Sequence, residues 1–258
     1  SLSKFNFNPK LFFYPNKRTT LYLGGTLTKE FREGGDMELL KNRVPSTANF
    51  YTDLQETNRY TTQFKLESDI KDNQILVIKN SFNVFDRYLN IRESASGNST
   101  IFGGRQNSSF SELTYNVALP KHELIFGTNY ITDNFERNNL DEADYIPITE
   151  NHQTASLFVN HIWEAASFLD LESGLRADWN KNSSNISEDE GRVFVMPRIA
   201  ALIKYSPKLT TRIGGGLGYR PLTIFNEEAE PYGFRNFQAI DFANLNAEQS
   251  IGLNGDFS

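Results

Sequence analysis

The 258-residue sequence contains no cysteine, so it has neither a disulfide framework nor a thiolate metal site. It has no apolar run of about 18 residues, which excludes a protein that crosses a membrane with helices. It also lacks an excess of positive charge, since 26 basic side chains stand against 32 acidic ones and the net charge is −6. No basic patch is present, and we therefore expect no nucleic-acid partner.

Motifs for catalysis and nucleotide binding are missing as well. There is no G-x-S-x-G, no H-E-x-x-H and no set of Ser, His and Asp that spacing brings together, so we expect no enzyme. The glycine run at 214–218 is not a dinucleotide motif, because Tyr219 takes the place of the last glycine and Pro221 opposes the helix that should follow. Glycines on a strand more commonly permit close backbone approach or bending of a barrel wall. We predict no catalytic residue and no cofactor.

A metal site held by the protein alone is not predicted either. His152 and His161 lie nine residues apart on one expected strand, so they face opposite sides and cannot share an ion, and His122 lies on another strand. The acidic run at 187–191 lacks the regular oxygen-ligand spacing of a calcium loop and is interpreted as a solvated charge run. Metal that arrives inside a chelate would need no histidine cluster.

The sequence does contain a strong alternation of apolar and polar residues. In residues 168–180 the odd positions are apolar or small, and the even positions carry four charges, Asp170, Glu172, Arg176 and Asp178. A period of two places these sets on opposite faces of a sheet. Unpaired charges are not tolerated in an ordinary core, so the pattern is typical of a membrane barrel wall with lipid outside and water inside. The mean hydropathy of −0.49 is compatible with this, because only alternate residues meet lipid.

Runs of this kind recur along the whole chain. We predict eleven strands, at 2–14, 19–32, 57–70, 74–92, 99–118, 122–137, 151–164, 168–181, 191–205, 209–220 and 246–257. Tight connections at 15–18, 71–73, 119–121, 165–167 and 206–208 alternate with longer loops at 33–56, 94–98, 138–150, 181–190 and 221–245. The fold class is therefore all-β, an antiparallel up-and-down transmembrane β-barrel in one domain. Asn80 is an exception to the pattern, because it falls on an otherwise apolar face.

Aromatic residues lie near both ends of the predicted strands. Tyr14, Trp163 and Tyr205 lie near short turns, whereas Trp179 and Tyr219 border long loops. We interpret them as girdles at two membrane interfaces, and the alternative is the rim of a soluble sandwich. Strands of 13 or more residues exceed the roughly 9–11 that cross a bilayer, which favours a large barrel.

Four segments resemble the barrel of a TonB-dependent outer-membrane receptor, in the order and spacing of that family. They are ASLFVNH at 155–161, LESGLRAD at 171–178, the pair MPRIA at 196–200 and GGGLGYRPLTIFNE at 214–227, and NLNAEQSIGL at 244–253. Three positions depart from the family pattern. Pro221 comes one place early, Ala247 replaces the usual Pro, and Asn254 replaces the usual Glu.

The resemblance implies active import of a scarce nutrient across the outer membrane of a Gram-negative bacterium. The usual cargo of the family is an iron–siderophore chelate, haem, cobalamin or an oligosaccharide. Its partners are outer-membrane lipid and lipopolysaccharide, the nutrient ligand, and the TonB-ExbB-ExbD complex, which acts through a plug domain. Residues 1–258 resemble neither a plug nor a terminal aromatic strand, and such barrels have about twenty-two strands. We therefore expect residues 1–258 to be an internal part of a receptor barrel, with further strands beside 1–14 and 246–258.

The loop at 221–245 holds the candidate ligand-binding residues Tyr232, Phe234, Arg235 and Phe237. Aromatic rings with a guanidinium suit a planar or anionic ligand, whereas packing against neighbouring loops is the alternative role. Two other functions stay open. A soluble β-sandwich or solenoid that binds glycans or acts as an adhesin would cover its apolar face with a second layer, and a barrel enzyme would need a catalytic set that the sequence does not show.

Overall fold

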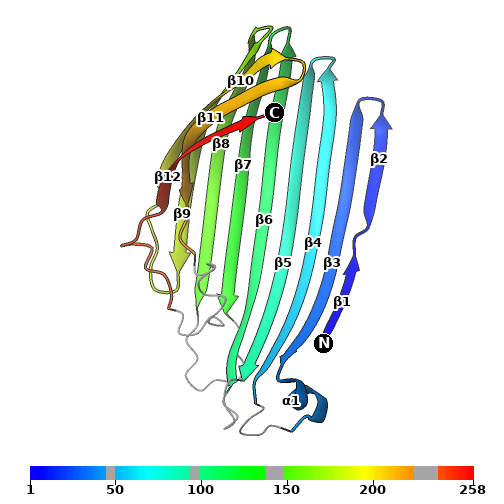
Figure 1. Ribbon diagram of the computed structural model, residues 1–258, viewed down its shortest axis with the longest axis vertical. Coiled ribbons are helices and arrows are strands. Elements are labelled where there is room, and N and C mark those ends of the chain that lie inside the picture. The colour runs from blue at the N-terminus through cyan, green and yellow to red at the C-terminus, as the bar shows by residue number, and fades with distance from the viewer. Residues whose placement is uncertain (45–49, 93–98, 138–147, 224–237) are drawn as a thin grey trace.

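The computed structural model describes residues 1–44, 50–92, 99–137, 148–223 and 238–258, and most of them lie in one curved antiparallel sheet (Figure 1). Each of the eleven predicted strands is present, and the first is divided in two. The strands are β1 (Leu2–Phe7), β2 (Lys10–Asn16), β3 (Thr19–Gly35), β4 (Thr52–Lys71), β5 (Gln74–Arg92), β6 (Ser99–Leu119), β7 (His122–Arg137), β8 (Thr149–Ala166), β9 (Leu169–Ser184), β10 (Arg192–Ser206), β11 (Leu209–Arg220) and β12 (Glu248–Phe257).

The strands follow one another in an up-and-down order from β1 through β3 to β12, and each neighbouring pair is antiparallel. The predicted topology is therefore confirmed. Among the described residues the sheet does not close, so it forms a partial barrel with β1 and β2 along one edge and β12 along the other. The five predicted tight turns lie at one end of this wall and the longer connections at the other, here called the turn end and the loop end.

The first edge strand is interrupted because it contains a proline. β1 pairs with residues 27–32 of β3 and β2 pairs with residues 19–24, so both run along the same side of β3. Between them the amide of Gly25 donates to the carbonyl of Pro9 at 3.0 Å. Pro9 itself has no N–H to donate, which is why the regular ladder breaks there.

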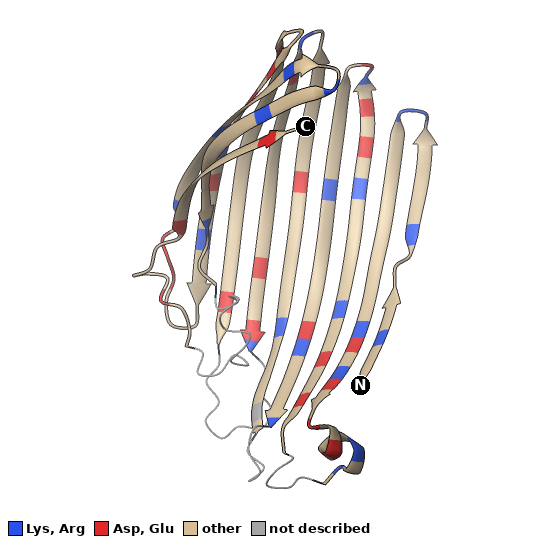
Figure 2. Cartoon of the chain, in the orientation of Figure 1, with Lys and Arg blue, Asp and Glu red and all other residues tan. Residues whose placement is uncertain are grey.

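The two faces of the sheet differ as the alternation predicts. Across the strands the residues on one face form apolar rows, such as Leu21, Leu66, Ile78 and Leu113, which are successive register partners. We call this the apolar face. The adjacent row on the opposite face, the polar face, includes Lys79, whose ammonium lies 2.8 Å from Glu112. Charged residues occur along the length of several strands as well as near their ends (Figure 2).

No second layer covers the apolar face over the described residues. Leu175 is 48% exposed, Ile199 is 65% exposed and Ile251 is 80% exposed. In a soluble sandwich these side chains would pack against a second sheet. The single exposed layer therefore contradicts the sandwich and agrees with a wall whose apolar face meets hydrocarbon.

Two tryptophans lie on this face, near the two ends of an apolar band. Trp163 is the register partner of Leu171, and Trp179 lies further along the same strand β9. The span from Leu171 to Trp179 is about 26 Å along the strand, which for a tilted strand is close to the height of a lipid-facing band. Leu175 lies halfway between them.

The prediction for Tyr219 is wrong. Instead of joining an interface girdle, Tyr219 stacks on Phe194 at 4.0 Å between ring centroids and donates a hydrogen bond to Asp178 at 3.2 Å. Asp178 and Phe194 are register partners on the polar face. The phenol of Tyr219 reaches past β10 to the carboxylate of Asp178 on β9. This hydrogen bond outweighs the preference of tyrosine for the membrane interface.

Two local details complete the fold. A six-residue helix α1 (Met37–Asn42), which was not predicted from the sequence, follows β3 and buries Leu39. Asn80 does lie on the apolar face, where its amide donates to the hydroxyl of Ser111 at 2.8 Å, so its polarity is satisfied within the sheet. In the described chain, no helix is long and apolar enough to cross a membrane.

Candidate functional site

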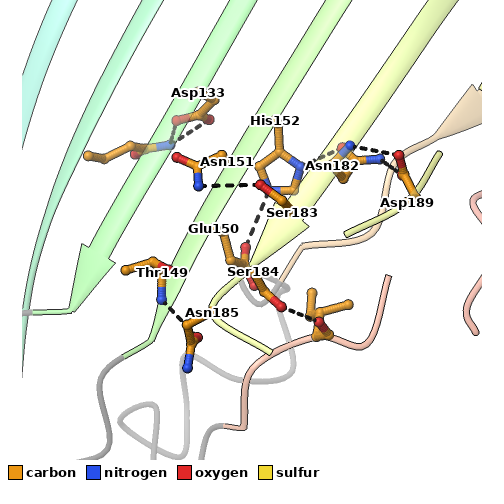
Figure 3. A network of polar contacts seen from close by, with 12 residues as sticks. Asp133, Thr149, Glu150, Asn151, His152, Asn182, Ser183, Ser184, Asn185 and Asp189 are labelled. Carbon is orange, nitrogen blue, oxygen red and sulfur yellow. Dashed lines mark hydrogen bonds and ion pairs between the residues drawn. The ribbon is translucent and has the colours of Figure 1, made fainter. Parts of the chain in front are cut away.

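A cluster of polar side chains occupies the polar face of β7, β8 and β9 at the loop end (Figure 3). We call Asp133, Glu150, His152, Asn182 and Asp189 the loop-end network. Alternation on β8 places Glu150 and His152 on one face, and the antiparallel register sets them beside Asn182 and Ser184 of β9. Asp133 is the register partner of His152 on the other side.

His152 lies at the centre of this network. Its Nδ1 is 2.8 Å from Oδ1 of Asn182, and its Nε2 is 3.3 Å from Oε2 of Glu150. Asn182 uses its amide nitrogen to donate to Asp189 at 2.8 Å, so its oxygen faces the histidine and Nδ1 is a donor. A proton must then lie between Nε2 and the Glu150 carboxyl. Glu150 is only 1% exposed, and its Oε1 has no partner among the described residues.

The loop between β9 and β10 is fixed against the same strands. Asp189 accepts the amides of Asn182 at 3.1 Å and of Gly191 at 2.9 Å. Gly191 has a φ of +84°, and a Cβ there would lie 2.7 Å from the indole nitrogen of Trp179, so glycine suits this turn. The loop therefore has one defined conformation against the wall.

A second loop segment, residues 238–245, folds onto the polar face beside the network. The carbonyl of Ile240 accepts the hydroxyls of Ser184 at 2.7 Å and Ser187 at 3.1 Å, and the amide of Phe242 donates to Ser187 at 2.7 Å. The ring of Phe242 meets His152 edge-on, with 5.6 Å between the centroids. We call residues 238–245 the strap.

The strap also contacts a small hydrophobic cluster on the polar face. Leu89, Phe102, Phe135 and Ile148 are at most 6% exposed, and Ile240 of the strap packs against them. Full burial of an isoleucine side chain contributes on the order of 1.5–3 kcal/mol, and Ile240, which is partly buried, contributes a fraction of that. The hydroxyl contacts and this packing together hold the strap inside the concave side of the wall.

An exposed turn within the strap is held by a carboxylate. Asp241 accepts a hydrogen bond from the side-chain amide of Asn244 at 2.8 Å and another from the amide of Ala243 at 3.2 Å. The hydrogen bond from Asn244 is the main reason that the pKa of Asp241 lies below its ordinary value. The carboxylate is therefore ionised under ordinary conditions and acts as the acceptor that the turn requires.

Further from the loop end, Arg176 organises the polar face. Its guanidinium donates to Asp178 at 2.7 Å, to Ser156 at 2.7 Å and to Asn129 at 3.2 Å. Asp178 is 4% exposed, so a charge that would be costly when buried alone is paired with a cation and with Tyr219. These contacts fix the side chains of β7, β8, β9 and β11 relative to one another.

The arrangement offers hydrogen-bonding groups and ordered loops on a concave wall. No group of three or more His, Asp or Glu side chains among the described residues could hold a metal ion. The predicted ligand residues Tyr232, Phe234, Arg235 and Phe237 lie outside the described residues, so their role stays a prediction. The sequence alone did not predict the network centred on His152. The spacing of Glu150 and His152 signals a common face, but the partners on β9 require the register.

Comparison with known proteins agrees with this architecture. The sequence profile of the family "TonB dependent receptor-like, beta-barrel" matches residues 2–255. No curated protein sequence matches. The matching family consists of transport receptors of the Gram-negative outer membrane rather than enzymes.

Solved structures share the fold at low sequence identity. FpvA of P. aeruginosa, bound to a heterologous pyoverdine, superposes with a TM-score of 0.74 at 13% identity, over 99% of this chain and 39% of its own. Fiu, the ferric-catecholate import receptor of E. coli K12, superposes with a TM-score of 0.70 at 10% identity, over 98% of this chain and 48% of its own. BauA, the ferric preacinetobactin receptor of Acinetobacter baumannii, superposes with a TM-score of 0.65 at 14% identity, over 86% of this chain and 41% of its own.

The chain thus spans less than half the length of each of these three receptors. The partial barrel, the two contrasting faces and the match over residues 2–255 agree with one another. The chain belongs to the TonB-dependent receptor-like β-barrel family.

Proposed function

We propose that this chain is part of the barrel domain of an outer-membrane receptor that imports a scarce nutrient with energy from the TonB-ExbB-ExbD complex. The observation that best supports this proposal is a single antiparallel wall with an exposed apolar face and an ionic concave face. Apolar side chains toward lipid and charged ones toward a wet interior are what a large outer-membrane barrel requires. The cargo we propose is an iron–siderophore chelate, with haem, cobalamin and an oligosaccharide as the other classes.

The iron chelate is placed first because the FpvA structure holds a pyoverdine with iron, Fiu is a ferric-catecholate import receptor, and BauA is a ferric preacinetobactin receptor. A metal that arrives within a chelate needs no metal ligands from the protein. Recognition then rests on hydrogen bonds, rings and charges at the mouth of the barrel. We also propose that the whole receptor has a plug domain, through which the TonB-ExbB-ExbD complex acts.

The loop that contains Tyr232, Phe234, Arg235 and Phe237 is proposed to contact the ligand. The strap follows directly after Phe237 in the chain, and it is anchored by Ser187 and Phe242 on the concave side. This anchorage ties the C-terminal part of the loop to the mouth of the barrel. Aromatic rings and a guanidinium suit a planar or anionic chelate.

Uptake in cells tests the import proposal. A strain that lacks the gene is compared with the complemented strain for accumulation of radiolabelled iron from a panel of ferric siderophores, with a strain lacking TonB as reference. We expect at least one siderophore to depend on both this protein and TonB. Unchanged uptake of siderophores, haem, cobalamin and oligosaccharides, together with a protein absent from the outer-membrane fraction, would contradict the proposal.

Alanine substitution of the four loop residues tests the proposed contacts. We expect the variant to insert normally but to bind the cargo about tenfold or more weakly, since aromatic and arginine anchors commonly dominate recognition. The matched control is Met37→Ala on α1, whose side chain is 79% exposed at a different loop. Equal weakening in both variants, or in neither, would reject a direct role for the four residues.

A further inference from the structure

Two histidines from different strands, His122 and His161, meet on the apolar face at the turn end. His122 begins β7 and His161 lies near the end of β8, and Nδ1 of His122 is 2.9 Å from Nε2 of His161. The register explains the contact. His122 pairs with Trp163 and Leu124 pairs with His161, so the two imidazoles are diagonal neighbours on one face. His152 is on the opposite face, as the nine-residue spacing predicts.

The orientation of the rings shows that the two nitrogens point at each other. The ring planes differ by only 20° and the centroids are 5.1 Å apart. This distance exceeds the separation of the nitrogens by close to one ring diameter, so the rings meet edge to edge and do not overlap face to face. The ring of Trp163, the register partner of His122, lies 6.0 Å from the His122 ring between centroids, with 15° between the ring planes. Both histidines are half-buried, so their outer atoms remain accessible.

The separation of the nitrogens matches two neighbouring ligands of one ion. Metal–imidazole bonds of about 2.0–2.1 Å at a right angle place two nitrogens about 2.9 Å apart. Cu²⁺ and Ni²⁺ prefer this tetragonal arrangement, and Cu²⁺ has the higher affinity in the divalent series. Each ring need only turn by about 45° to direct its lone pair at a common point, while the backbone stays in the ladder.

We propose that His122 and His161 form a two-imidazole binding site for a divalent transition metal ion, with Cu²⁺ preferred, at the turn end of the apolar face. The remaining coordination positions are filled by water at the rim of the apolar band. In the neutral pair one nitrogen carries the proton of the hydrogen bond. When the ion binds, this proton moves to the other nitrogen of the same ring, so both facing nitrogens become ligands without net proton release.

Paramagnetic resonance of Cu²⁺ tests the site directly. The receptor is expressed at its full native length with a tag that contains no histidine, purified in detergent and titrated with Cu²⁺. We expect one equivalent to bind with hyperfine coupling to two imidazole nitrogens. His122→Phe and His161→Phe should each weaken binding about a hundredfold and leave at most one nitrogen, because the second ligand acts at high effective concentration. Phenylalanine retains a ring and suits the apolar face.

His152→Gln is the matched control, because it removes the third histidine of the chain from the opposite face. We expect this variant to bind Cu²⁺ as the unaltered protein does. Quenching of Trp163 fluorescence by the ion, absent in Trp163→Phe, gives a second readout of position. If a phenylalanine variant fails to insert, the paramagnetic resonance spectrum of the unaltered protein still tests the site. A Cu²⁺ signal without two coupled nitrogens overturns the site. Equal affinity in the His122→Phe/His161→Phe double variant, or equal loss in His152→Gln, also overturns it.

Discussion

The two faces of strand β9 show how one segment adapts to two surroundings. Leu175 is 48% exposed on the apolar face, and its neighbour Arg176 donates hydrogen bonds to three side chains on the polar face. On the apolar face the requirement is only hydrophobicity, because lipid chains have no fixed shape. On the polar face each partner is specific, because a buried charge without its partner is costly. The effect of a substitution on stability should therefore depend on the face of the sheet that carries the residue more than on its position along the chain.

The largest expected effect comes from placing a charge on the apolar face. Leu175→Arg, midway between Trp163 and Trp179, should destabilise the inserted protein by about 2–4 kcal/mol. Leu175→Val should cost less than about 1.5 kcal/mol, because it keeps the face apolar. Urea unfolding from lipid vesicles measures both changes.

Ser81→Arg is the control on the polar face. Ser81 lies between the register partners Gln63 and Phe110, and a cation there should change stability by only about 0.5 kcal/mol. If arginine at 81 and at 175 cost the same, the difference between the faces would be refuted.

A smaller effect is expected from removing a specific partner on the polar face. Arg176→Met leaves the buried carboxylate of Asp178 with the hydroxyl of Tyr219 and should cost about 2–3 kcal/mol, below the range for fully buried pairs because Arg176 is 33% exposed. The double variant Arg176→Met/Asp178→Leu should recover most of this loss. A double-mutant cycle in the same unfolding assay measures the coupling, and a double variant as unstable as the sum of both singles would argue against a paired charge.

The strap offers a local test on the polar face. Ser187→Ala removes hydrogen bonds to Ile240 and Phe242 and should lower the free energy of opening of the strap by about 1 kcal/mol. Hydrogen exchange of the Phe242 amide reports this opening. Ser206→Ala, which removes a hydroxyl contact to the Lys208 amide at the turn end, is the control and should leave that exchange rate unchanged. Faster exchange in both variants would mean that the strap is not held by Ser187.

The smallest effect concerns acid. Because the pKa of Asp241 is below its ordinary value, its contribution to the strap is complete above about pH 4, the usual carboxyl range, and is lost as the pH falls through the lowered pKa. We expect the protection of the Ala243 amide to fall in that acidic window. Asp241→Asn should have less protection at neutral pH and no such transition, whereas an unchanged transition in this variant would assign it to another group.

The sequence was sufficient for the strands and their faces, because alternation and turn residues are local signals. It located each of the eleven runs and the face of residues such as Leu171 and Arg176. It did not reveal the break at Pro9, although a proline within an edge strand was a usable signal. Tyr219 was misassigned because its partner Asp178 lies two strands away, on β9.

Contacts that depend on register could not be read from the sequence. The pairing of His152 with Asn182 requires that β8 and β9 align in one specific register, and a slip of one residue would move every side chain to the other face. The contact between His122 and His161 has the same origin. The sequence of one strand does not specify its register against the next strand. The register is determined in the assembled sheet, by the cross-strand pairs of all its rows together.

The apolar face should meet hydrocarbon and the polar face should meet water, residue by residue along a strand. Because residues 1–258 contain no cysteine, a single one can be placed in turn at each position from 171 to 178 and spin-labelled in the protein in lipid vesicles. We expect collisions with oxygen, which concentrates in lipid, to be highest at 171, 173, 175 and 177. Collisions with a water-soluble nickel complex should be highest at 172, 174, 176 and 178. Profiles without this alternation, or with both reagents favouring the same positions, would contradict a wall with one face in lipid and the other in water.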